Sequence, residues 1–164
     1  MVAAFEPEPW RDFGVATAGA AAALAGLLFV AVSINLREIT SRPQLPARAA
    51  ATLGLLVMLL LVGVFLVAPG QTMTSLGTET VVLGVLYAAG TIAGALHRHR
   101  GRHAVWVLAS LVLQAVPGVL LIAGGISMLV GSGGGLYWVM AAVATGFAAA
   151  VASSWVLLVQ ISAE

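Results

Sequence analysis

The stretch FGVATAGAAAALAGLLFVAVSINL, from Phe13 to Leu36, decides the class of this protein because it contains no charged side chain. A span needs about 20 apolar residues, at about 1.5 Å each, to cross the roughly 30 Å hydrocarbon layer of a bilayer. The whole chain has the same character: 61% of its 164 residues are hydrophobic and 8% are charged. Soluble domains carry about 25% charged residues. The sequence therefore predicts an integral membrane protein.

Four further stretches share this character, and none carries a charged side chain away from its ends. The last two are separated by a glycine-rich segment at 131–135, which is typical of a loop. The leader before the first stretch has two glutamates and one aspartate against one arginine, the opposite of a signal peptide, so we expect the first span to be a helix of the mature protein. We predict a single all-α transmembrane domain over residues 1–164, a polytopic bundle with five spans at about 13–36, 49–68, 79–96, 104–130 and 137–160.

The arginine residues predict the orientation of the chain. Six of the seven lie in the loops after the first and third spans, and the loops after the second and fourth spans contain none. Short cytoplasmic loops are enriched in basic residues, so we predict an outside N-terminus and an inside C-terminus. Every basic residue is arginine, a bias typical of GC-rich bacterial genomes, and the expected location is the bacterial cytoplasmic (inner) membrane. The six residues are Arg37, Arg42, Arg48, Arg98, Arg100 and Arg102.

The turn HRHRGRH, from His97 to His103, holds all three histidines of the chain. We interpret it first as a topology signal on a short cytoplasmic loop. A metal site is disfavoured because the arginines repel a cation and no carboxylate lies nearby. Nucleic-acid binding is disfavoured because the turn offers no scaffold to enter a groove. Contact with anionic lipid is the further role we expect for Arg98, Arg100 and Arg102.

The first span carries a line of small side chains along its full length. Gly19, Gly26 and Ser33 recur every seven residues, which places them on one helix face. Small residues let membrane helices approach closely, so this face predicts helix packing, either inside the bundle or against a second copy. The alternative is a pore lined by this face in a homo-oligomer, with Asn35 forming a polar ring at the mouth. Ala16, Ala23 and Val30 form the adjoining line.

The fourth predicted span contains a polar residue, Gln114, close to Pro117. Proline cannot donate a hydrogen bond to the carbonyl of Leu113, so the helix is expected to bend there. Tyr87 and Gln114 each lie ten residues from the predicted cytoplasmic turn, which places both about 15 Å above it. Polar atoms in hydrocarbon need internal partners. We therefore predict that the two side chains are partners, with the Tyr87 hydroxyl facing Gln114 directly or through water, and that Tyr87→Phe and Gln114→Leu are non-additive.

The segments LLFVAVSINLREI at 27–39 and LPARAA at 45–50 resemble those of a group of short, uncharacterised bacterial multispanning membrane proteins. Such proteins are sometimes named modulators of the FtsH protease. The resemblance covers about the first third of the chain. It implies a regulatory partner protein and no chemistry, and it carries over no catalytic residue.

The interiors of the five predicted spans contain no aspartate, glutamate or histidine. Intramembrane catalysis, haem ligation and ion-coupled transport depend on such groups, so we expect neither an enzyme nor a bound cofactor. We expect a non-catalytic protein that self-associates, or docks on another membrane complex as an accessory or regulatory subunit. The alternative is a homo-oligomeric ion channel lined by the first span. The expected partners are the lipid bilayer and another copy or another membrane protein.

Overall fold

The computed structural model describes residues 4–42, 45–98 and 104–162, and every regular element within these ranges is helical. The predicted all-α class is therefore confirmed. The elements are the short 3-10 helix η2 (Glu8–Trp10) and the α-helices α1 (Arg11–Ile34), α2 (Leu36–Ser41), α3 (Leu45–Val67), α4 (Met73–Arg98), α5 (Ala104–Val130) and α6 (Leu136–Ser162).

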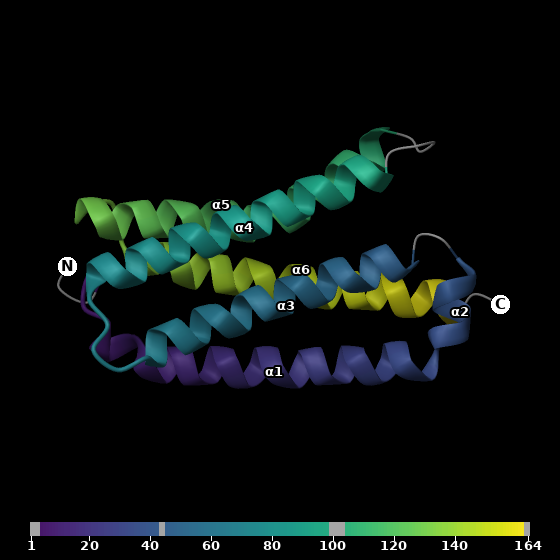
Figure 1. Cartoon of the computed structure of the whole chain (residues 1–164), viewed down its shortest axis with the longest axis horizontal. Helices are drawn as coiled ribbons and strands as arrows, with labels where there is room; N and C mark the ends of the chain where they lie inside the picture. Colours follow the sequence, from purple (N-terminus) through teal and green to yellow (C-terminus); the bar gives the residue numbers. More distant parts are fainter. Residues whose placement is uncertain (1–3, 43–44, 99–103, 163–164) are drawn as a thin grey trace.

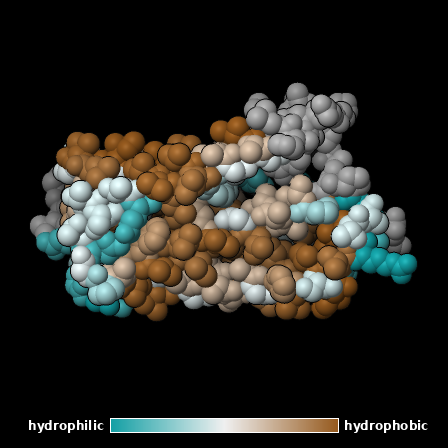
Figure 2. Space-filling model, viewed as in Figure 1, coloured by the Kyte–Doolittle hydropathy of each residue, from teal (hydrophilic) through white to brown (hydrophobic). Residues whose placement is uncertain are grey.

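Most of the helical length is apolar enough for a bilayer. The C-terminal part of α5, Gln114–Val130, is a further apolar helix, shorter than the four segments named below. Figure 2 shows hydrophobic residues over most of the visible surface, with hydrophilic residues gathered toward the two ends. These features support an integral membrane protein. The four segments long and apolar enough to span a membrane are Glu8–Ile34, Leu45–Val67, Met73–Gly94 and Leu136–Leu157.

The long helices form two antiparallel hairpins with α6 between them. α1 pairs with α3, and α4 pairs with α5, through the most extensive interfaces of the bundle. α6 packs against both α5 and α3, while α1 and α6 barely touch. Figure 1 shows the α1–α3 hairpin below, the α4–α5 hairpin above, and α6 at the level between them. α1 begins at one end of the bundle and α6 finishes at the other.

Two helices begin before the apolar stretches that predicted them. α3 starts at Leu45 with Pro46 in its first turn, where the missing proline N–H leaves no helical bond unmade. α4 starts at Met73 after a reciprocal cap: Ser75 N donates to Thr72 Oγ1 over 3.1 Å, and Thr72 N donates to Ser75 Oγ over 3.0 Å. Hydropathy marks the apolar part of a helix, whereas its start depends on such capping residues.

The α1–α3 hairpin depends on a glycine in each helix. Gly14 and Gly63 face each other so closely that a Cβ at Gly63 would lie 2.7 Å from the Gly14 carbonyl oxygen and 2.6 Å from the main-chain nitrogen of Ala18. No side chain larger than hydrogen fits at Gly63. Because lipid supplies no hydrophobic force between helices, this close backbone contact provides the dispersion energy that holds them together.

The α4–α5 hairpin uses the same device twice. Gly77 and Gly84 on α4 lie opposite Gly125 and Gly118 on α5, in antiparallel order. A Cβ at Gly125 would lie 2.7 Å from the Gly77 carbonyl oxygen, and one at Gly84 would lie 3.1 Å from that of Gly118. The two glycines on each helix are seven residues apart. Seven residues are about two turns, so the same faces of the two helices meet at both contacts.

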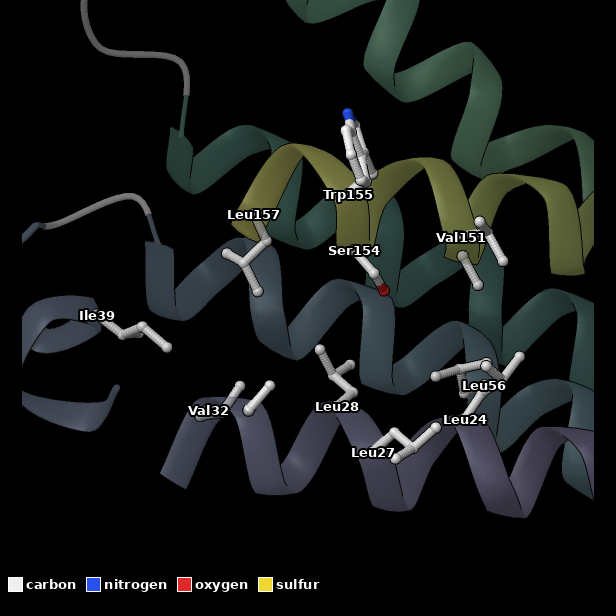
Figure 3. A pocket seen from close by; sticks show the side chains of 12 residues that line it. Leu24, Leu27, Leu28, Val32, Ile39, Leu56, Val151, Ser154, Trp155 and Leu157 are labelled. Carbon is white, nitrogen blue, oxygen red and sulfur yellow. The ribbon is translucent and has the colours of Figure 1, made fainter. Parts of the chain in front are cut away.

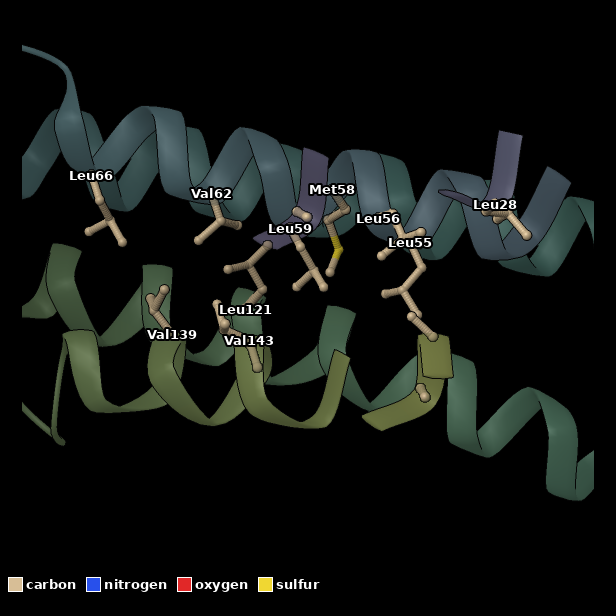
Figure 4. Close-up of a cluster of buried hydrophobic side chains, with 14 of the residues drawn as sticks. Leu28, Leu55, Leu56, Met58, Leu59, Val62, Leu66, Leu121, Val139 and Val143 are labelled. Carbon is tan, nitrogen blue, oxygen red and sulfur yellow. The ribbon is translucent and has the colours of Figure 1, made fainter. Parts of the chain in front are cut away.

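α3 is the central helix of the bundle. It packs against α1, α6 and α4, and Figure 4 shows its buried side chains facing Val139 and Val143 of α6 and Leu121 of α5. α3 also has the largest buried share among the four apolar segments, as expected for a helix that is hydrophobic on all sides. The buried side chains labelled on this helix are Leu55, Leu56, Met58, Leu59, Val62 and Leu66.

The residues before α1 fold over the end of the bundle where α6 begins. Trp10 is buried, with its ring centroid 5.2 Å from that of Tyr137 and 5.7 Å from that of Phe13, in edge-to-face geometry. Gly135 has a φ of +48°, and a Cβ there would collide with the Ala4 carbonyl. The glycine-rich loop before α6 is therefore a compact turn on which the N-terminal segment rests.

A matched pair of glycines on α3 tests the close helix contact. Gly63→Ala should lower the free energy of unfolding by about 1–3 kcal/mol, because the new methyl group overpacks the α1 backbone. A Cβ at Gly54 would meet no atom within 4 Å, so Gly54→Ala should leave stability unchanged or raise it by up to about 1 kcal/mol. Unfolding of both variants in detergent micelles measures the difference. Equal effects of the two substitutions would contradict this account of the hairpin.

Candidate functional site

The small-residue face of α1 points away from the bundle. Gly19, Gly26 and Ser33 are exposed, and a Cβ at either glycine would meet no atom within 4 Å. The adjoining line is exposed as well. We predicted that this face packs either inside the bundle or against a second copy. Within the described residues, no packing inside the bundle is found for it. The adjoining residues are Ala16, Ala23 and Val30.

α1 packs on α3 through a different line of residues. Gly14, Ala21 and Leu28 are buried and also recur every seven residues. They precede Gly19, Gly26 and Ser33 by five positions each, which is a rotation of about 140° around the helix. α1 thus has two lines with the same spacing on different sides. The line of Gly14, Ala21 and Leu28 is buried, and the line of Gly19, Gly26 and Ser33 faces outward.

The polar residues at the end of α1 bond within their own helix. The Ser33 hydroxyl donates to the Phe29 carbonyl over 2.8 Å, and the Asn35 carboxamide donates to the Ala31 carbonyl over 2.9 Å. Asn35 also separates α1 from α2, with a φ of −104° and a ψ of 20°. The main-chain N–H of Asn35 donates to the same Ala31 carbonyl over 3.3 Å, so two donors of Asn35 close the last turn of α1.

Tyr87 and Gln114 are brought together, but through the main chain of Gln114. The Tyr87 hydroxyl donates to the Gln114 carbonyl oxygen over 3.0 Å, so the predicted pairing of the two side chains is wrong in its acceptor. The Tyr87 ring lies against Gly118, where a Cβ would be 2.9 Å from Cδ1 of the ring. The absence of a side chain at Gly118, next to Pro117, gives the tyrosine access to the α5 backbone.

The arginine cluster predicted to contact lipid falls at the edge of the described chain. Arg98 is the last residue of α4, while Arg100 and Arg102 lie outside the described residues. In the part of the chain that the structure describes, no group of three histidine, cysteine, aspartate or glutamate side chains is arranged to hold a metal ion.

A polar cluster near the start of α4 was not predicted from the sequence. The Gln71 amide donates to Glu79 Oε2 over 2.7 Å, and the Ser75 hydroxyl donates to Gln71 Oε1 over 2.7 Å. These bonds tie the loop after α3 to the second turn of α4. The threonine and serine three residues apart are a sequence signal for the cap, but nothing in the sequence predicts that Gln71 folds back onto Glu79.

Comparison with protein-family models, with curated proteins and with solved structures finds no match to this chain. The outward face of α1, defined by Gly19, Gly26 and Ser33 with Ala16, Ala23 and Val30 beside them, is the candidate functional site because it has the residue types of the internal helix contacts and no partner within the described chain.

A double-mutant cycle tests the geometry of the tyrosine contact. Tyr87→Phe should lower the free energy of unfolding by about 1 kcal/mol, because it removes one hydrogen bond inside the membrane. Gln114→Leu keeps the main-chain acceptor, so the two substitutions should be additive within about 0.5 kcal/mol. Unfolding in detergent micelles provides the four free energies. A coupling energy well above that limit would mean that the hydroxyl bonds the carboxamide instead.

Proposed function

We propose that this protein is a non-catalytic integral membrane protein that associates through the outward face of α1, with a second copy or with another membrane complex, as an accessory or regulatory subunit. The observation that carries the proposal is the exposure of Gly19 and Gly26, where a Cβ would meet no atom within 4 Å. A helical glycine costs about 1 kcal/mol relative to alanine. Within the described chain neither glycine recovers that cost through a close contact.

The internal interfaces support this role for small residues. Where α1 meets α3, the closest contact joins Gly14 and Ala18 of α1 to Gly63 of α3. The outward face of α1 also carries glycine, at 19 and 26 of the same helix. A helix from another chain could approach it as closely as α3 approaches the opposite side, and close backbone approach is the usual basis of helix association in lipid.

The proposal includes five spans, an outside N-terminus and an inside C-terminus in a bacterial cytoplasmic membrane. α5 has 27 residues, about 40 Å of helix, which is enough to cross the hydrocarbon. The opposite ends at which α1 begins and α6 finishes support an odd number of crossings. Arg37, Arg42 and Arg48 follow α1 or begin α3, and the positive-inside rule assigns that end to the cytoplasm.

The resemblance of residues 27–39 and 45–50 to bacterial proteins named as protease modulators supports a regulatory partner. That resemblance includes the last turns of α1, much of α2 and the start of α3. Docking of a partner on α1 would therefore use the part of the chain that carries the resemblance. No catalytic role is proposed for any residue.

A homo-oligomeric channel lined by the outward face of α1 is the second candidate. The face is continuous from Ala16 to Ser33, which a pore lining requires. However, the Ser33 hydroxyl and the Asn35 amide donate to carbonyls of their own helix. These bonds leave the oxygen atoms of Ser33 and Asn35 as acceptors at one end of the face only. The rest of the face is glycine, alanine and valine, which offers an ion no polar side chain and favours packing over a pore.

Leucine substitution at two exposed glycines tests the association. Gly26→Leu should weaken self-association about tenfold, or about 1.4 kcal/mol, by separating the helix backbones, while the fold of each copy is unchanged. Gly54→Leu is the matched control. Gly54 lies on α3, outside the proposed face, and a Cβ there would also meet no atom within 4 Å. Single-molecule photobleaching in lipid vesicles measures the fraction of oligomers. Equal effects of the two variants would contradict the assignment to α1, and a monomeric wild-type protein would contradict self-association.

A further inference from the structure

A groove runs between α1 and α6, with α3 as its floor. The groove encloses a cavity of about 260 Å³. Figure 3 shows Leu28 and Val32 pointing from α1 toward α6, and Leu157 pointing from α6 toward α1. Leu28, Leu157 and the floor residue Leu56 are all buried. The groove exists because α1 and α6 each pack on α3 but barely touch each other.

The groove opens to the outside of the bundle. Its rims are Leu27 on α1, 67% exposed, and Val151 on α6, 56% exposed. Eleven of its twelve lining residues are apolar, and Ser154 is the exception. Such a wall offers water almost no hydrogen-bond partner, and apolar cavities of this kind stay dry. In a bilayer, the opening meets hydrocarbon.

The dimensions of the groove select a thin, flexible occupant. The lining on α1 runs from Leu24 to Val32, about 12 Å along the helix axis. A segment of helix about 10 Å wide and about 12 Å long would fill about 900 Å³, which is several times the cavity volume. The cavity is nevertheless larger than the roughly 150 Å³ that accommodates a benzene molecule. One acyl chain running along the helices meets both limits.

Positive charge lies at one end of the groove. Ile39 of α2 lines the cavity. Arg37 lies two residues earlier on the same short helix, about 160° around its axis, and is exposed at this end of the bundle, where its long side chain can extend toward a headgroup. Glu38 pairs with Arg42 over 3.0 Å, and no acidic partner of Arg37 is found within the described residues. A phosphate at this end would be attracted to Arg37, as basic residues next to a membrane surface attract anionic headgroups.

We propose that the groove between α1, α3 and α6 is a lipid site, in which one acyl chain of an anionic phospholipid lies against Leu28, Leu56 and Leu157 while its headgroup lies beside Arg37. The site does not depend on the outward face of α1 or on self-association. The acyl chain moves from the apolar bilayer into an apolar groove, so the selectivity of the site comes from its shape and from the headgroup.

Photoreactive lipids test the site in the full-length protein. Phosphatidylglycerol with a diazirine in its acyl chain is included at low fraction in phosphatidylcholine vesicles, and phosphatidylcholine with the same chain is the comparison. Labelled peptides should concentrate on residues 24–32 and 150–157 rather than on Val82 and Leu86 of α4, which are 51% and 65% exposed. Labelling in proportion to exposure, or cross-linking of the groove to another protein in place of lipid, would overturn the proposal.

Variants separate the two parts of the site. Ala31→Phe narrows the groove and should reduce its labelling to the level of other lipid-facing helices, whereas Ala89→Phe, on an exposed position of α4, should have no effect. Ser154→Phe narrows the groove from α6 and gives the same test if Ala31→Phe does not fold. Arg37→Gln should lower the preference for phosphatidylglycerol about fivefold. Undiminished labelling in both narrowed proteins would overturn the acyl-chain site, and equal wild-type labelling by the two lipids would overturn the headgroup assignment.

Discussion

Close contact between glycine backbones is the interaction on which this bundle depends. Gly14 meets Gly63 between α1 and α3, and Gly77 and Gly84 meet Gly125 and Gly118 between α4 and α5. In water, the burial of apolar surface would hold such helices together, but in lipid the surrounding tails are equally apolar. Close packing therefore has to supply the stability, and it does so where side chains are smallest. The two hairpins that result create the surfaces on which α6 packs.

The same constraint explains which features of the fold can be predicted from the sequence. The all-α class follows from uncharged apolar stretches, because a lipid-embedded backbone must satisfy its own hydrogen bonds. The packing face of α1 does not follow. Gly14, Ala21 and Leu28 repeat with the same spacing as Gly19, Gly26 and Ser33, and only the position of Gly63 on α3 selects between the two lines. That pairing depends on the tertiary arrangement.

The candidate sites show the same division. The equal distance of Tyr87 and Gln114 from the predicted turn was enough to predict that they lie close together. The acceptor, however, is a main-chain carbonyl, which the tyrosine reaches because Gly118 has no side chain. The groove beside α6 has no sequence signal at all, because it arises from two helices that pack on α3 without meeting each other. Sequence patterns indicate depth and helix face, whereas sites between three helices depend on the completed packing.

Disulfide formation between copies tests the central claim, association through the outward face of α1, most directly. The chain contains no cysteine, so a single introduced cysteine reports only its own contacts, and a disulfide requires Cα atoms about 4.4–6.8 Å apart. In native membranes under mild oxidation, Ala23→Cys should form covalent dimers, whereas Ala89→Cys, equally accessible on α4, should remain monomeric. Equal dimer yields from the two variants, or dimers from Ala89→Cys alone, would contradict the account.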